Sequence, residues 1–194
     1  IAAGPLHDPV LLAVPAGGVP VAAAMADAMG LPLQAAVVSK ITLPSNTEVG
    51  CGAIAFDGTC RINEPLVRQA GLEAEALRAA TERTRQKVVR RCERFCGPGG
   101  RPECAGRDAI VVDDGLASGF TLRVAIEAVR SLGPARLMLA VPTAHEGSLC
   151  ELSEGVDVAW CANVRSGPRF AVADAYERWT DVADATAERL LNAS

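Results

Sequence analysis

Short apolar runs alternate with helix-like segments along most of this chain, and this alternation constrains the fold more than any other feature. The runs that we interpret as strands cover residues 10–14, 33–39, 109–113, 136–141 and 156–161. The segments that we interpret as helices cover residues 19–29, 64–95, 121–132, 146–154 and 181–191. Strands that alternate with helices are typical of a mainly parallel sheet with helices on both faces. The sequence therefore predicts a doubly wound α/β fold.

The segment between residues 44 and 63 departs from this pattern. Its Gly, Asn and Asp residues break it into short pieces such as 52–56 and 60–62. The dipeptide Asp57-Gly58 between those two pieces is typical of a hairpin turn. We therefore predict a small hairpin that forms a hood beside the main sheet.

The helical segment that follows has a break at Gly71 and leads into a Gly-rich loop at residues 97–100. A chain of 194 residues can bury one sizeable core but is short for two ordinary domains. We therefore expect one domain over residues 1–194, with a helical and Gly-rich insertion around residues 64–106.

Composition excludes several classes of function. Apolar residues make up 49% and charged residues 22% of the chain, as in an ordered globular protein. The formal net charge of −4 provides no basic field for nucleic acid or for an anionic membrane. The apolar runs are too short, and too often interrupted by Gly and Pro, to span a bilayer. Small molecules are therefore the expected partners.

The cysteines indicate a compartment rather than a site. There are seven, so they cannot all pair, and nothing that resembles a signal peptide precedes them. We therefore predict a reducing compartment, the cytoplasm. Cys92, Cys96 and Cys104 lie close together, but their spacing is not that of structural zinc sites and no histidine is near them. We expect no metal ion at these thiols.

The loop between the predicted strand 109–113 and the predicted helix 121–132 has the composition of a phosphate site. Gly115 and Gly119 allow backbone N–H groups to converge on an anion, and Ser118 adds a hydroxyl donor. Thr121 begins the helix, whose N-terminus carries roughly half a positive charge. The loop therefore predicts binding of a phosphate group.

Asp113 and Asp114 end the same strand. Ionised carboxylates accept hydrogen bonds from paired sugar hydroxyls and can help to hold a magnesium ion. The alternative is an ordinary strand-to-helix turn in which Asp114 starts a cap. We favour the ligand, because two carboxylates directly after a buried strand cost free energy unless a ligand binds them.

Basic residues outside the loop give weaker signals. Lys40 follows the predicted strand 33–39, at the carboxyl end where ligand contacts concentrate in open α/β sheets. Six more lie on the predicted helix before the Gly-rich loop, namely Arg83, Arg85, Lys87, Arg90, Arg91 and Arg94. Glu82 and Glu93 are interleaved with them, so we predict a solvated helix face, with contact to phosphates as the alternative.

Residues 111–121, Val-Val-Asp-Asp-Gly-Leu-Ala-Ser-Gly-Phe-Thr, resemble the phosphoribosyl diphosphate signature of type I phosphoribosyltransferases. In that signature a hydrophobic strand leads into two acids and a loop of Gly, Ser or Thr, and Gly. Residues 13–22, the step Ser39-Lys40-Ile41 and the tripeptide Gly52-Ala53-Ile54 precede it in order. Together these segments are similar to a bacterial and archaeal group of phosphoribosyltransferases without an assigned substrate. The resemblance runs from about Val10 to near the C-terminus.

The resemblance implies roles for individual residues. Asp113 and Asp114 would bind the ribose hydroxyls, and Ala16-Gly17-Gly18 would face the diphosphate. Lys40 would be a nearby cation, and with the two acids it completes the expected catalytic set. The expected 5-phosphate loop comprises Gly115, Leu116, Ala117, Ser118, Gly119, Phe120 and Thr121. Mg²⁺ is the expected cofactor, bound mainly through the substrate rather than by direct protein ligands.

Two departures from the family's pattern concern the diphosphate. Members usually carry Arg where this chain has Ala16, and often Arg where it has Ser39. Each lost charge-assisted contact is worth about 1.5 to 3 kcal/mol. If departure of the diphosphate needs that charge, Ala16→Arg should raise turnover.

Five further residues have both a functional and a purely structural interpretation. Glu48 and Glu64 could serve the ligand, but exposed acids more often only solvate a surface. His145 follows the predicted strand 136–141, yet a lone histidine is more often an incidental loop residue. Tyr176 and Trp179 could stack on a base, although packing of the last segment is the favoured role.

Three functions follow from these patterns. The first is an enzyme of nucleotide metabolism that transfers ribose 5-phosphate from phosphoribosyl diphosphate to a nitrogen acceptor. The second is a non-catalytic module of the same fold that senses phosphoribosyl diphosphate or a nucleoside monophosphate. The third, a doubly wound domain for another phosphate ligand such as a flavin, has no supporting motif beyond the loop. These patterns leave two points open, the identity of the acceptor and the formation of a homodimer.

Overall fold

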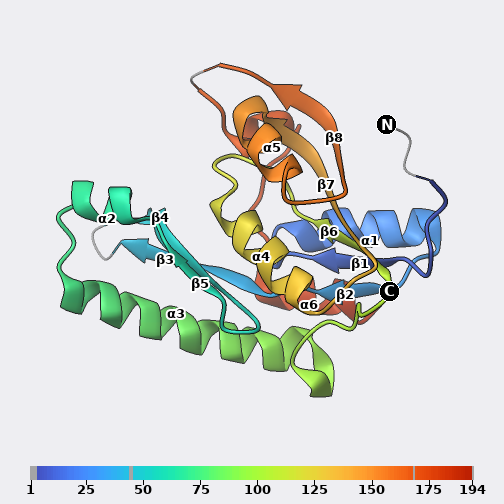
Figure 1. Cartoon of the computed structure of the whole chain (residues 1–194), viewed down its shortest axis with the longest axis horizontal. Helices are drawn as coiled ribbons and strands as arrows, with labels where there is room; N and C mark the ends of the chain where they lie inside the picture. The colour runs from blue at the N-terminus through green and yellow to red at the C-terminus, as the bar shows by residue number, and fades with distance from the viewer. Residues whose placement is uncertain (1–3, 44–45, 168, 194) are drawn as a thin grey trace.

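A five-stranded parallel sheet forms the centre of the protein, in a computed structural model that describes residues 4–43, 46–167 and 169–193. Its strand order is β2-β1-β6-β7-β8 (Figure 1). The strands are β1 (Val10–Ala13), β2 (Leu33–Ala35), β6 (Asp108–Val112), β7 (Arg136–His145) and β8 (Val158–Arg165). All neighbouring pairs are parallel. The predicted doubly wound sheet is therefore confirmed.

Helices cover both faces of this sheet because the residues of each buried strand alternate between two apolar cores. In β6, Ile110 belongs to one core and Val111 to the other. The first core lies under α1 (Gly18–Met29) and α6 (Asp184–Leu191). The second lies under α4 (Phe120–Ser131) and α5 (Glu146–Ser153).

A second, antiparallel sheet extends away from the first (Figure 1). It contains β3 (Val38–Leu43), β4 (Asn46–Ala55) and β5 (Cys60–Ile62). The hairpin predicted around Asp57-Gly58 is confirmed, because β4 and β5 pair in antiparallel register. The Asp57 carboxylate accepts hydrogen bonds from the N–H and the hydroxyl of Thr59, and Gly58 has a φ of +90°, so the turn has the residues it requires.

Two helices complete this part of the chain. They are α2 (Glu64–Gln69) and α3 (Ala74–Phe95), separated at Gly71, which has a φ of +61°. The predicted break is therefore confirmed. The helix α3 packs along one face of β3 and β4, whereas α4 packs on the other face. The remaining helical turns are η1 (Gly97–Gly99) and η2 (Val172–Ala175).

Two predictions about strands were wrong. The apolar run 33–39 is not one strand, because the chain leaves the parallel sheet after Ala35 and enters the antiparallel sheet at Val38. The segment after residue 44 is not a set of short pieces, because β4 is a ten-residue strand. Gly52 in this strand serves close packing, since a Cβ there would lie 2.7 Å from the carbonyl oxygen of Arg61 on β5.

The strand order determines where a ligand can bind. It reverses between β1 and β6, which pair through Ala13 and Val112 at their carboxyl ends. The helices that follow these strands, α1 and α4, pack on opposite faces of the sheet. In open α/β sheets the two diverging connections leave a crevice at this switch point. A ligand site is therefore expected at the residues that follow Ala13 and Val112.

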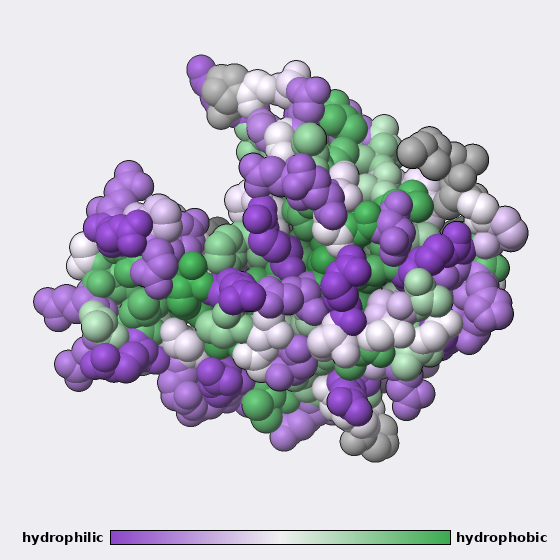
Figure 2. All heavy atoms as spheres, in the orientation of Figure 1, coloured by the Kyte–Doolittle hydropathy of each residue, from purple (hydrophilic) through white to green (hydrophobic). Residues whose placement is uncertain are grey.

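The surface is consistent with this placement. In the view of Figure 1 it is hollowed between the part that carries α2 and the part that carries β8 (Figure 2). The longest helix among the described residues is α3, with 22 residues, and it is rich in charged side chains. No helix in the described ranges combines the length and the apolar character needed to cross a membrane.

Candidate active site

A cavity of about 460 Å³ opens at the carboxyl ends of β1 and β6. Five parts of the chain line it: the loop after β1, strand β3, helix α3, the segment from Asp113 to Leu122, and the C-terminal segment with Val172 and Trp179. This volume suits a small phosphorylated molecule. The cavity therefore lies where the topology places a ligand.

The loop after β6 forms one wall of the cavity, and every residue from Asp113 to Thr121 lines it. Hydrogen bonds to β7 hold the loop in place: the Leu116 N–H donates to the Thr143 carbonyl (2.9 Å), and the His145 N–H donates to the Leu116 carbonyl (2.8 Å). Gly119 ends the loop with a φ of +71°. A Cβ there would lie 2.5 Å from Leu152 Cδ1, so no larger residue fits without movement.

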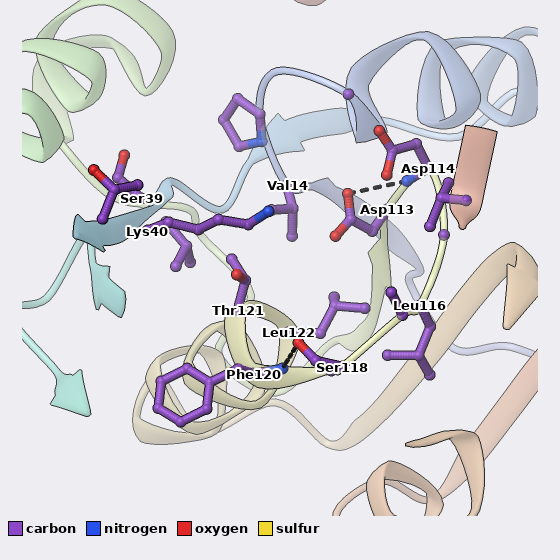
Figure 3. Close-up of a pocket in the computed structure, with 18 of the residues that line it drawn as sticks. Val14, Ser39, Lys40, Asp113, Asp114, Leu116, Ser118, Phe120, Thr121 and Leu122 are labelled. Carbon is purple, nitrogen blue, oxygen red and sulfur yellow. Dashed lines mark hydrogen bonds between the residues drawn. The ribbon is translucent and has the colours of Figure 1, made fainter. Parts of the chain in front are cut away.

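The same loop presents the start of α4 to the cavity. Ser118, Phe120 and Thr121 gather at this helix end (Figure 3). Gly119 has no side chain to cap the helix, and among the described residues the side-chain contact to the first turn is a long one, 3.5 Å from the Phe120 N–H to Ser118 Oγ. Uncapped N–H groups and the helix dipole together favour an anion. This wall can hold a phosphate group.

Asp113 and Asp114 lie beside this loop, and both are partly buried. Burial raises the pKa of Asp113 well above its usual range, and the neighbouring charge of Asp114 raises it further. Burial also raises the pKa of Asp114, whereas the ammonium of Lys40 opposes the rise at both acids. Burial therefore disfavours the ionised form of both carboxyl groups, and hydrogen bonds from hydroxyl groups or a bound cation would stabilise that form.

Glycines allow the loop after β1 to approach these acids. A Cβ at Gly17 would lie 1.9 Å from Asp114 Oδ2, and one at Gly18 would lie 2.7 Å from the Val112 carbonyl oxygen. Of the three residues predicted to face the diphosphate, Gly17 lines the cavity, whereas Ala16 and Gly18 do not. Ala16 instead packs against the core under α1, and the peptide bond that joins it to Pro15 is cis.

Lys40 lines the cavity, but not for the reason predicted. It is the third residue of β3 in the antiparallel sheet and not the end of a parallel strand. Its side chain extends across the cavity toward Asp113 and Asp114 (Figure 3). Among the described residues it forms no ion pair. The ammonium is thus held near the acids by its strand and is free to contact a ligand.

The basic stretch of α3 is mostly the solvated face predicted, but two of its members, Lys87 and Arg91, line the cavity. Arg91 is 14% exposed and donates to both carboxylate oxygens of Asp184 on α6 (3.1 and 2.5 Å), and more weakly to the Pro15 carbonyl (3.4 Å). The buried positions Val88 and Cys92 directly follow these two residues on the helix. The helical period was therefore the signal that could have found them.

The C-terminal segment packs onto the acid side of the cavity. The Tyr176 hydroxyl donates to the backbone carbonyl of Asp114 (2.6 Å), and its ring makes an edge contact with Trp179, centroid to centroid 5.1 Å. Burial and the charges of Asp114 and Asp113 raise the pKa of Tyr176 to about 12. Tyr176 therefore fixes the loop, whereas Trp179 lines the cavity.

The other singled-out residues lie away from the cavity. Glu64 is exposed at the start of α2. The His145 ring contacts the Gly167 carbonyl through Nε2 (3.2 Å) and lies edge-on to Phe170. The side chain of Glu48 lies outside the described part of the structure.

Metal ligands are few in the described ranges. No three His, Cys, Asp or Glu side chains there converge on one point. All seven cysteines are free thiols. The carboxylates of Asp113 and Asp114 are hard oxygen donors of the type that Mg²⁺ accepts, but two ligands leave most of its octahedral shell to other groups.

Comparison with known proteins identifies relatives of this chain. Residues 2–161 match the family model of the phosphoribosyl transferase domain. Two proteins from Mycobacterium tuberculosis, each named "Putative phosphoribosyl transferase" (MT0597 and Rv0571c), are 34% identical to it over 175 residues. The match covers 90% of this chain but only 39% of those relatives. The crystal structure of TT1426 from Thermus thermophilus superposes with a TM-score of 0.72 at 30% identity, over 96% of this chain and 88% of that one.

Proposed function

Because the chain belongs to the phosphoribosyl transferase domain family, we propose that it transfers the ribose 5-phosphate group of phosphoribosyl diphosphate to a nitrogen acceptor and releases diphosphate. One observation carries the proposal. The uncapped start of α4 and the acids Asp113 and Asp114 open on the same cavity, at the switch point of the sheet. A 5-phosphate and the hydroxyls of one ribose need such a pair of neighbouring subsites.

The reaction requires positioning more than covalent help. The acceptor nitrogen forms a bond to C1 of the ribose, and the bond from C1 to the diphosphate oxygen breaks with both electrons going to that oxygen. The acceptor loses one proton to solvent or to the departing diphosphate. Asp113 and Asp114 would hold the ribose hydroxyls and offset the positive charge that develops on the ring. Lys40, which faces them, would offset negative charge on the leaving group.

Mg²⁺ fits this site as a partner of the substrate. The described residues offer it two carboxylates and no complete shell, so phosphate and hydroxyl oxygens of the substrate would supply the other ligands. When bound, the ion would neutralise charge on the diphosphate.

The seven free thiols support the predicted cytoplasmic, reducing compartment.

A specific observation supports a second function, a non-catalytic sensor of phosphoribosyl diphosphate or a nucleoside monophosphate. The side chains at Ala16 and Ser39 carry no charge, and Ala16 packs into the core instead of the cavity. A site that binds the ligand but stabilises the leaving group poorly would bind without turnover.

A thermal-shift screen followed by an activity assay tests both functions. With Mg²⁺ present, phosphoribosyl diphosphate or a nucleoside 5-monophosphate should raise the melting temperature, because each binds only the folded state. Diphosphate release is then measured with a panel of purine and pyrimidine bases. Turnover supports the transferase, whereas tight binding without turnover favours the sensor. Absence of any shift at millimolar ligand would count against both.

A further inference from the structure

Helix α3 brings two like charges to the cavity. Lys87 and Arg91 lie one turn apart and both line it. Like charges at this spacing repel each other, and loss of solvation together with the charge of Arg91 lowers the pKa of Lys87. Asp184 compensates Arg91 through a two-oxygen contact. Within the described ranges, Lys87 has no carboxylate within ion-pair distance.

A buried hydroxyl group lies on the same side. Ser39 is 3% exposed and lines the cavity, and its Oγ has no hydrogen-bond partner in the described part of the chain. Residues alternate between the two faces of β3, so Ser39 shares its face with Ile41, which belongs to the core that contains α3. A buried polar atom without a partner costs free energy, and a ligand that accepts its hydrogen bond would remove that cost.

These groups reach the cavity from the opposite side to the phosphate loop. The helix α3 packs on one face of β3, and α4 packs on the other. The start of α4 and the Lys87 side of the cavity are therefore separate places that both favour negative charge. Asp113 and Asp114 line the cavity after β6, and their negative charge disfavours an anionic group directly beside them.

We propose that Lys87, Arg91 and Ser39 form the subsite for a second anionic group of the ligand, separate from the anion site at the start of α4. Given the proposed function, on which this inference rests, the second group is the diphosphate of phosphoribosyl diphosphate. Lys87 and Arg91 then supply the positive charge at the diphosphate that Ala16 and Ser39 lack. The site distinguishes phosphoribosyl diphosphate from ribose 5-phosphate, which has only one anionic group.

The two cations have different tasks. Arg91 is tied to Asp184 and contacts the Pro15 carbonyl, so it holds the loop after β1 against α3 and α6 as well as adding charge. Lys87 has no such ion pair within the described part of the chain, so it is the residue available to bind the second anionic group. Lys87→Gln is therefore the informative variant, because it removes the charge without removing a contact that supports the fold.

The test is calorimetric titration with Mg²⁺ and three probes: phosphoribosyl diphosphate, ribose 5-phosphate and inorganic diphosphate. We expect Lys87→Gln to weaken binding of phosphoribosyl diphosphate and of inorganic diphosphate by about tenfold or more, because it removes one charge-assisted contact. Binding of ribose 5-phosphate should change by less than about twofold. Ser39→Ala should show the same pattern with a smaller effect. Arg90→Gln, on the same helix but exposed and outside the cavity, is the matched control and should leave all three unchanged.

The outcomes separate this inference from the function on which it rests. If the parent binds phosphoribosyl diphosphate and Lys87→Gln binds it equally well, the inference is overturned and the proposed function stands. If the variant loses ribose 5-phosphate to the same degree, Lys87 does not serve a second anionic group and the inference is again overturned. If the parent binds neither sugar phosphate, the proposed function fails and the inference falls with it.

Discussion

The two sides of the cavity are built in different ways. One side is a single stretch of chain, the loop from Asp113 to Thr121, which carries both the acids and the uncapped start of α4. The other is assembled from β3 and α3, and its charged members, Lys40, Lys87 and Arg91, come from distant parts of the sequence. The first can be recognised as a sequence pattern, whereas the second exists only after folding.

Each side holds two neighbouring charges of the same sign that have lost part of their solvation. They are negative on the loop side and positive on the α3 side. Burial raises the pKa of Asp113 on the loop side, and loss of solvation lowers the pKa of Lys87 on the α3 side. Each arrangement disfavours its own charged state in the free protein, which is typical of functional sites. A ligand that presents hydroxyl groups to the acids and anionic groups to the cations would relieve both, and phosphoribosyl diphosphate has this pattern.

The largest expected effect is on the loop side. Asp113→Asn combined with Asp114→Asn should weaken binding of phosphoribosyl diphosphate on the order of 100-fold, because two charge-assisted contacts to the ribose are lost. The fold should remain, since neither acid has a partner in the core. Calorimetric titration measures the first and a circular-dichroism melt the second. Asp174→Asn, an exposed acid outside the cavity, is the control.

Either of two results would remove the ribose assignment. Binding as tight as that of the parent would show that the acids do not contact the sugar. Loss of the folded state would show instead that the acids are structural and that the Tyr176 contact at Asp114 depends on them.

Local patterns were sufficient to predict much of the parallel sheet and the loop side of the site. The apolar runs that become β1 and β6 are continuous because both faces of these strands are buried. The glycine that ends α1, Gly30, adopts the left-handed conformation expected of a helix stop. Each of these features depends on residues that are near one another in the chain.

The α3 side could not be predicted in the same way. The run 33–39 is mostly apolar, so no local signal marks the point between Ala35 and Val38 where the chain changes sheets. The helical period places Lys87 and Arg91 at the edge of the buried face of α3. Only the packing of α3 on β3, however, decides that this edge meets the cavity. Long-range contacts therefore determine both the change of sheet and the side of α3 that meets the cavity.

A second prediction tests the close approach of the loop after β1 to the acids. In Gly17→Ala the added Cβ would lie 1.9 Å from Asp114 Oδ2, so the carboxylate or the loop must move. We expect about tenfold weaker binding of phosphoribosyl diphosphate, with the loss of one contact at the ribose. The control is Gly99→Ala, where nothing lies within 4 Å of the added atom and the φ is not positive. Unchanged binding by Gly17→Ala would mean that the loop after β1 is not part of the site.

A third prediction concerns Ala16, in the loop after β1. If α3 supplies the charge that the diphosphate needs, Ala16→Arg should change the rate of diphosphate release by less than about threefold in the parent. In the Lys87→Gln background the same substitution should raise the rate by more. Ala16 lies between Pro15 and Gly17, which line the cavity, and a guanidinium that reaches the cavity from there replaces a missing cation. A large gain in the parent alone would show that α3 does not serve this role.

The smallest expected effect is on stability and concerns Asp113 alone. Its pKa is raised in the folded protein above the ordinary value of about 3.9, first by burial and then by the charge of Asp114. Above the raised pKa both the folded and the unfolded chain carry the charge, and the folded chain bears the full cost of burying it. Below the ordinary value neither carries it.

Asp113→Asn should therefore raise the melting temperature at pH 7.5 by on the order of a few degrees, and this gain should shrink as pH falls through the raised pKa toward 4. The Asn carbonyl can still accept the hydrogen bond from the Asp114 N–H, which Asp113 Oδ1 accepts at 3.0 Å, so the charge is the main difference. Melts of parent and variant from pH 5 to 8 measure the trend. Adding phosphoribosyl diphosphate with Mg²⁺ should reverse the ranking at pH 7.5, since only the parent keeps both contacts to the ribose. A variant that is less stable than the parent at every pH would contradict the view that Asp113 is kept at a cost to the free protein for the sake of the ligand.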